Sequence, residues 1–106
     1  MAWIMLLLAG LFEIGFTTAL RYTEGLTRLL PLLLFVLFAS TSLYLLMKAS
    51  ETIPLGTSYA VWTGIGAAGT ALAGIFYFGE PVTTLRLLFL STLIGSIIGL
   101  KLVAGT

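Results

Sequence analysis

The sequence predicts an all-α membrane protein with four transmembrane helices. Of its 106 residues, 59% are hydrophobic and only 8% are charged, whereas about 25% are charged in an ordinary soluble domain. The few charges divide the chain into four apolar runs, each near the ~20 residues that cross a bilayer as a helix. We expect helices at about residues 2–20, 29–47, 57–78 and 82–103, forming a single four-helix transmembrane domain over residues 1–106.

The first run is apolar except for Glu13 and ends at the charged segment from Arg21 to Arg28. It has no basic segment at its start and carries an acidic residue, so we expect it to be retained rather than removed as a signal peptide. The second run contains no charge and ends at Lys48.

The third run is also uncharged and ends at Gly79-Glu80-Pro81. The fourth is expected to become helical at about Pro81, because proline suits a first helical turn.

Positive charges, which set the orientation of membrane proteins, are balanced between the two sides. One side has Arg21, Arg28 and Arg86, and the other has Lys48, Lys101 and the terminal amine. Three against three suggests insertion in both orientations, which an antiparallel dimer would need.

Several classes of function are excluded by composition. The chain has no cysteine and no histidine, which excludes disulfide scaffolds, thiolate catalysis and histidine acid–base chemistry, and argues against a metal site. Its net charge of +1 lacks the basic footprint of a nucleic-acid binder. No nucleophile–base pair stands out, so we expect neither an enzyme nor a cofactor.

Glu13 is the residue that points most directly to function. An ionised side chain in mid-span costs at least ~2.5–3.5 kcal/mol if it faces lipid. A structural role as a protonated, hydrogen-bonded carboxyl group is one interpretation. The other is a site that holds either a proton or a cation, because burial disfavours the charged carboxylate and favours its neutralisation. Gly10, Phe16 and Thr17 lie within about a turn of Glu13 on its helix face, and we expect them to line a pocket.

The second and third helices offer further polar and aromatic groups. Ser42 is the natural candidate to hydrogen-bond Glu13, although a hydroxyl can also bond its own helix. Tyr59 and Trp62 share a helix face, with Thr63 beside them. A tyrosine hydroxyl could donate to a carboxylate and an indole suits an organic cation, whereas the alternative is an interfacial aromatic belt.

Glycines form two patterns in the second half of the chain. Residues 64–69 match G-x-G-x-x-G, but they lie inside an apolar run without the strand that a dinucleotide site requires. Gly64 and Gly66 more plausibly permit close packing or a hinge. Gly95 and Gly99 form a G-x-x-x-G ridge, typical of helix association in membranes.

Together these features resemble the small multidrug resistance family over the whole chain. The segments that carry the resemblance are residues 9–13 (AGLFE), 24–31 (EGLTRLLP) and 53–67 (IPLGTSYAVWTGIGA). Residues 62–67, 79–81 and 99–101 resemble the guanidinium-exporter subgroup.

The resemblance implies an antiparallel, dual-topology homodimer in the inner (plasma) membrane that exports cations against inward proton flow. It implies that Glu13 of both copies binds protons and substrate, with Ser42, Tyr59 and Trp62 around it. It also places the third-helix bend at Gly64 and Gly66. The small organic cation is then guanidinium or a substituted guanidinium.

Phe16 departs from the subgroup, whose members usually carry tryptophan there. Phenylalanine cannot donate a hydrogen bond to the carboxylate, which makes substituted guanidinium or quaternary ammonium ions more credible substrates. A broader quaternary ammonium exporter is therefore the alternative within transport. A non-transporting accessory membrane subunit is the alternative from another class.

Overall fold

The computed structural model describes residues 1–104 and contains four helices there. They are α1 (Ala2–Arg21), α2 (Leu29–Ser50), α3 (Leu55–Tyr77) and α4 (Thr84–Ala104). Each is long and apolar enough to cross a membrane. The prediction of an all-helical chain with four membrane-length helices is therefore confirmed.

The connection between α3 and α4 differs from the expectation. The amides of Phe78 and Glu80 both donate to Gly74 O, which ends α3. Helix α4 then begins at Thr84, because the Thr83 side chain accepts a hydrogen bond from the Arg86 amide and caps the first turn. Pro81 thus lies in the loop before the cap rather than in the first helical turn.

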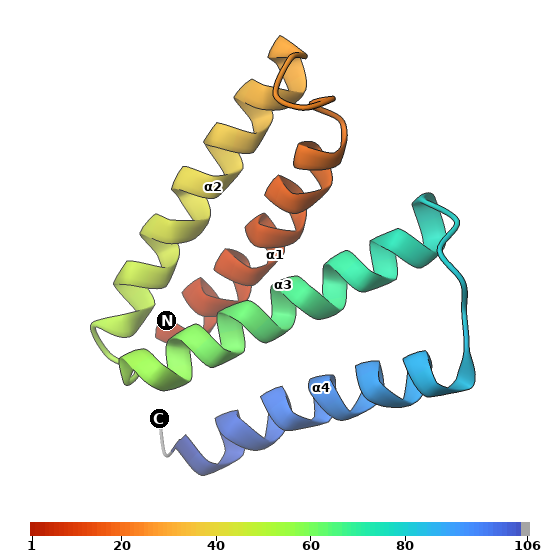
Figure 1. Ribbon diagram of the computed structural model, residues 1–106. Coiled ribbons are helices and arrows are strands. Elements are labelled where there is room, and N and C mark those ends of the chain that lie inside the picture. Colours follow the sequence, from red (N-terminus) through yellow and green to blue (C-terminus); the bar gives the residue numbers. More distant parts are fainter. Residues whose placement is uncertain (105–106) are drawn as a thin grey trace.

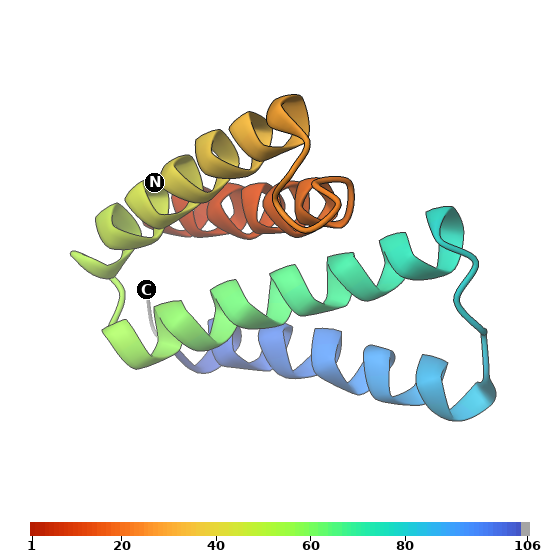
Figure 2. The same cartoon turned by 45° about the horizontal axis from the view of Figure 1, so that its top comes forward.

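Helix α1 lies between α2 and α3, and among the described residues the backbone of α4 approaches that of α3 only (Figures 1 and 2). Successive helices run in opposite directions, so the N-terminus, the α2–α3 loop and the end of α4 share one end of the molecule (Figure 1). The buried apolar cluster also lies toward this end, where the first half of α1 meets the last turns of α2 and the start of α3. Its members are Leu6, Ala9, Leu46, Ala49, Ile53 and Val61.

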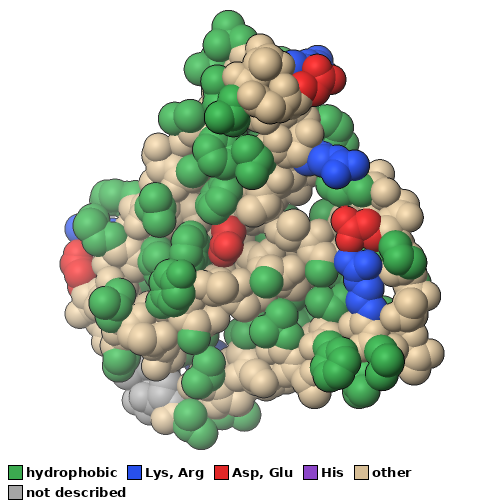
Figure 3. Space-filling view, viewed as in Figure 1, with side chains coloured by type: hydrophobic (Ala, Val, Ile, Leu, Met, Phe, Trp, Pro, Cys, Tyr) green, Lys and Arg blue, Asp and Glu red, His purple; other side chains and the backbone are tan. Residues whose placement is uncertain are grey.

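The outer surface of the molecule is apolar. Hydrophobic side chains spread over the face seen in Figure 3, and charged groups gather mainly near its edge, apart from an acidic group near the centre. Helix α4 has no buried residue in the span Thr84–Val103. Such surfaces suit hydrocarbon rather than water.

Candidate functional site

Glu13 lies past the middle of α1, and its carboxyl group points at α3. The contact is with Gly66, where an added Cβ would overlap the Glu13 Cδ and Oε1 atoms. Glu13 Oε1 is buried and has no hydrogen-bond partner among the described residues. Only a glycine at position 66 leaves the carboxyl group this space, and among the described residues Oε1 is left without a donor.

Small residues let α1 and α3 approach closely on both sides of Glu13. One turn before it, Gly10 lies against Ile65, whose Cγ2 would be 2.5 Å from an added Cβ. One residue after it, Ile14 packs directly on Gly69. We call this line of contacts the α1–α3 seam. It brings the two helices together at the depth of the carboxyl group.

A pair of threonines continues the seam one turn beyond Glu13. Thr17 Oγ1 lies 2.6 Å from Thr70 Oγ1 and 3.0 Å from both Glu13 O and Ile14 O. Thr70 was not among the predicted site residues. Its spacing of four from Gly66 places both on one helix face, which is the signal that could have identified it.

Ser42 links three helices, but not through the Glu13 carboxyl group. Its side chain is fully buried and donates to Ala9 O at 2.6 Å, while Trp62 Nε1 donates to Ser42 Oγ at 2.8 Å. Ala9 precedes Glu13 by four residues, so this link lies one helical turn from the carboxyl group. The expected hydrogen bond from Ser42 to Glu13 is therefore not formed, because the Ser42 hydroxyl donates to Ala9 O instead.

The aromatic residues of the predicted site lie at two places. Tyr59 packs on Trp62 with ring centroids 5.7 Å apart, and Tyr59 is 56% exposed. Phe16 faces α2, where it meets Phe35 edge-on at a centroid distance of 5.7 Å. Among the described residues, no hydrogen bond joins Tyr59 or Trp62 to Glu13 within the chain.

The remaining predicted residues are distributed over α3 and α4. Thr63 is exposed on α3. Gly64 lies within the continuous helix α3 and faces α4, with Ile97 Cδ1 2.8 Å from where its Cβ would be. Gly95 and Gly99 on α4 have open space around them within the chain. Gly64 and Gly66 therefore serve two different helix contacts, one with α4 and one with α1.

These observations define a class of protein: a four-helix membrane protein with an ionisable group held between two of its spans. An intramembrane carboxyl group of this kind is typical of proton and ion pathways. Among the described residues, no three histidine, cysteine or acidic side chains gather as a metal site would require.

The chain belongs to the small multidrug resistance family. The family description "Small Multidrug Resistance protein" matches residues 1–94, which confirms the resemblance found in the sequence. Membership makes the chain a membrane transporter and not an enzyme.

Relatives cover almost the full length of the chain. A protein of Citrobacter freundii is 48% identical over 102 residues, covering 96% of this chain and 97% of its own. A protein of Salmonella typhimurium (strain LT2) is 47% identical over 104 residues, which cover 98% of this chain and 99% of its own. One from Yersinia pseudotuberculosis is 46% identical over 102 residues, with 96% and 98% covered. Each is named "Guanidinium exporter".

Proposed function

We propose that this protein is a proton-coupled antiporter that exports guanidinium or substituted guanidinium ions across the inner (plasma) membrane. The observation that carries the proposal is the Glu13 carboxyl group, held in a membrane span with Oε1 buried and unpartnered among the described residues. The choice of substrate is supported by the relatives named as guanidinium exporters. Tyr59 and Trp62 supply aromatic surface suited to an organic cation.

Competition for one carboxylate provides the coupling. A guanidinium ion presents paired N–H donors that a carboxylate can accept in a bidentate, charge-assisted arrangement. A proton neutralises the same group and removes the attraction. On one side of the membrane, protonation of Glu13 releases the cation. On the other side, binding of a cation releases the proton, so that one cation leaves as protons enter. Gly10, Phe16, Thr17 and Thr63 line the pocket in this proposal, and Ser42 fixes the helices around it.

The working unit in this proposal is an antiparallel, dual-topology homodimer with both Glu13 carboxyl groups in one site. The two ends of the helix bundle carry three basic groups each, and this balance supports insertion in both orientations. Helix α4 supports pairing, because among the described residues its backbone approaches only α3, and the space around Gly95 and Gly99 is open to a second α4. Gly64 and Gly66 would be the hinge when the two copies exchange conformations.

The decisive test is Glu13→Gln in proteoliposomes. Glutamine keeps the shape of the side chain but can neither carry a negative charge nor exchange a proton. We expect guanidinium-driven currents to fall to the level of empty vesicles. Glu51→Gln is the matched control, because Glu51 is an exposed residue that pairs only with Lys48, and it should transport at near wild-type rate. Transport by Glu13→Gln at that rate would refute the mechanism.

The same competition fixes the sign of the pH dependence. Lowering the pH protonates a larger fraction of the Glu13 carboxylates, so the apparent affinity for guanidinium should weaken as pH falls. In the range where one proton competes with one cation, the apparent Kd should rise about tenfold per pH unit. Binding titrations at several pH values measure this slope, and a Kd independent of pH would contradict competition.

A broader quaternary ammonium exporter is the second candidate, and Phe16 favours it. Its ring packs on Phe35 and offers no hydrogen-bond donor to orient the carboxylate. Selectivity then depends more on apolar contact, which contributes up to about 0.8 kcal/mol for each buried CH₂. Currents from a series of alkylated guanidinium and tetraalkylammonium ions distinguish the two candidates.

A further inference from the structure

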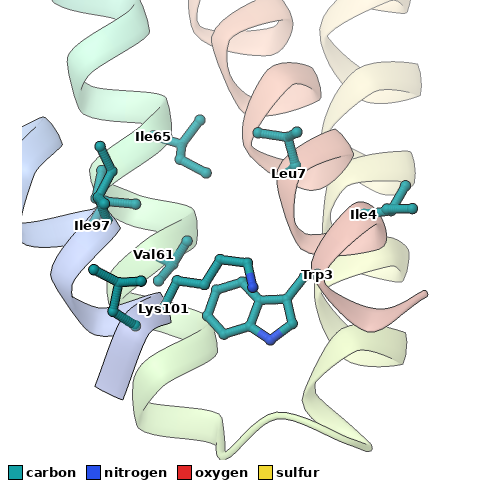
Figure 4. Close-up of a pocket in the computed structure, with 9 residues that line it drawn as sticks. Trp3, Ile4, Leu7, Val61, Ile65, Ile97 and Lys101 are labelled. Atoms are coloured by element: carbon teal, nitrogen blue, oxygen red, sulfur yellow. The ribbon is translucent and has the colours of Figure 1, made fainter. Parts of the chain in front are cut away.

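A groove lies between α1, α3 and α4, away from the Glu13 carboxyl group. Its volume is about 340 Å³. Its lining is almost wholly apolar and comes from all three helices (Figure 4). The main contributors are Trp3, Leu7, Val61, Ile65, Ile97 and Lys101. We call it the Lys101 groove.

Lys101 supplies the only charge among the described residues that line this groove. Its side chain reaches from α4 toward α1 and places Nζ 4.9 Å from the centroid of the Trp3 ring (Figure 4). The loop glutamates Glu24, Glu51 and Glu80 each pair with another basic residue. Among the described residues, therefore, no carboxylate neutralises Lys101.

The position of Lys101 matches the depth of lipid headgroups. It lies in the last turn of the membrane-spanning helix α4, at the same end as the N-terminus (Figure 1). A lysine at a helix end carries its ammonium to the interface while its stem stays in apolar surroundings. The apolar lining continues from Lys101 toward the middle of the span through Ile97, Ile65 and Leu7.

We propose that the Lys101 groove binds an anionic phospholipid. The lipid phosphate pairs with Lys101 Nζ, and one acyl chain lies along the apolar lining formed by Leu7, Ile65 and Ile97. The groove matches both parts of such a lipid. Lys101, which no described carboxylate neutralises, faces the phosphate, and the apolar lining that leads inward from it faces the acyl chain. A zwitterionic lipid would match only the apolar half.

Charge also argues against a second copy of the chain as the occupant. In an antiparallel pair, the end facing Lys101 would carry Arg21, Arg28 and Arg86 against two glutamates. Both of those glutamates already pair within their own chain. A second copy would thus bring net positive charge to a positive site.

Trp3 provides a direct probe, because the chain has only two tryptophans, Trp3 and Trp62. In the Trp62→Phe variant the indole of Trp3 is the sole emitter and lines the groove. Quenching is measured in bilayers that contain either brominated phosphatidylglycerol or brominated phosphatidylcholine at equal mole fraction, without transport substrate. We expect the anionic lipid to associate more tightly by a factor on the order of five, as one interfacial lysine provides.

Lys101→Gln should abolish this preference, while Lys48→Gln should retain it. Lys48 is the matched control because it lies at the same end but pairs with Glu51. Equal quenching by the two lipids would overturn the proposal, and so would equal loss of preference in both variants. Protection of Trp3 from both lipids would also overturn it, by showing that protein covers the groove.

Native mass spectrometry repeats the comparison without the tryptophan substitution. Wild-type protein should retain phosphatidylglycerol in preference to phosphatidylcholine. Lys101→Gln should lose that preference, and Lys48→Gln should not. Retention of neither lipid, or of both equally, by the wild-type protein would count against the site.

Discussion

Phe16 and Glu13 are three residues apart on α1, yet their side chains meet different helices. Phe16 packs on Phe35 of α2, whereas the Glu13 carboxyl group faces Gly66 of α3. Within one copy of the chain, the Phe16 ring and the Glu13 carboxyl group therefore have different neighbours. In the proposed mechanism, a substitution at Phe16 can therefore change substrate preference while Glu13 still exchanges protons.

Phe16→Trp should shift preference toward unsubstituted guanidinium. An indole at position 16 that turns away from Phe35 can donate its N–H to the Glu13 carboxylate, one turn away, and a hydrogen bond to a charged group contributes about 1.5–3 kcal/mol. We expect the ratio of guanidinium to tetramethylammonium currents to rise at least about tenfold. The control is Phe35→Trp, which adds an indole to the same aromatic pair on α2. An unchanged ratio in Phe16→Trp would mean that Phe16 only packs.

Thr70→Val should weaken the α1–α3 seam modestly. It removes the interhelical hydrogen bond, while the Thr17 hydroxyl keeps its acceptors on its own helix. We expect a loss of about 0.6 kcal/mol in the free energy of unfolding, the average for such bonds in a membrane. Unfolding in mixed micelles measures it. Thr92→Val is the control, because Thr92 is exposed and bonds only its own helix; equal losses in both variants would contradict a specific Thr17–Thr70 bond.

Sequence reasoning identified the residue types of the site better than their partners. Glu13 is recognisable in sequence because a charge in a long apolar run is unusual. From sequence, the Ser42 hydroxyl could donate either to Glu13 or to a carbonyl of its own helix. The packing of α1 against α2 decides that Ala9 O accepts this hydrogen bond instead. Thr70 was missed because a threonine in an apolar helix gains significance only when the opposing helix is known.

At the scale of the helices, the glycines of α3 determine which elements can touch. The side chain of Ile97 from α4 packs against Gly64, and the side chain of Glu13 from α1 packs against Gly66. The apolar runs and their lengths predict the helices themselves, since the bilayer fixes the length of a span. The order in which the helices pack does not follow from run length, because every span is apolar on most of its circumference.

Gly66→Ala should impair transport with little loss of folded protein. The added Cβ would overlap the Glu13 carboxyl group, but that group ends a flexible side chain and can move aside. Its displacement from the productive geometry should reduce the transport rate at least about tenfold. Gly56→Ala, at a position with open space on the same helix, is the matched control. Equal transport rates in the two variants would show that the contact between Gly66 and Glu13 does not affect transport.

At the scale of the whole molecule, the balance of charge predicts the topology. Reporters fused to the C-terminus, each active on one side of the membrane, should reveal both orientations. One added lysine in the loop between α1 and α2 should shift the population strongly toward one of them, because lysine and arginine near helix ends set orientation. More than about nine in ten molecules in one orientation, without that lysine, would refute dual topology.

The hydrogen bonds from Trp62 to Ser42 and from Ser42 to Ala9 O would act as a pivot in the proposed transport cycle. They tie α3, α2 and α1 together at one depth, on the N-terminal side of Glu13 in α1. Beyond them, toward the end that carries Arg21, α1 and α3 are joined by glycine contacts, by one pair of hydroxyls and by Phe78, whose ring packs against Tyr22 and Arg21. If α3 tilts against α1, the residues near the Trp62–Ser42–Ala9 hydrogen bonds would therefore move little. The displacement of α3 would increase with distance from these bonds. The carboxyl group, one turn from the pivot, would be uncovered by a small rotation, whereas the far ends would separate only where the Phe78 contacts with Tyr22 and Arg21 break.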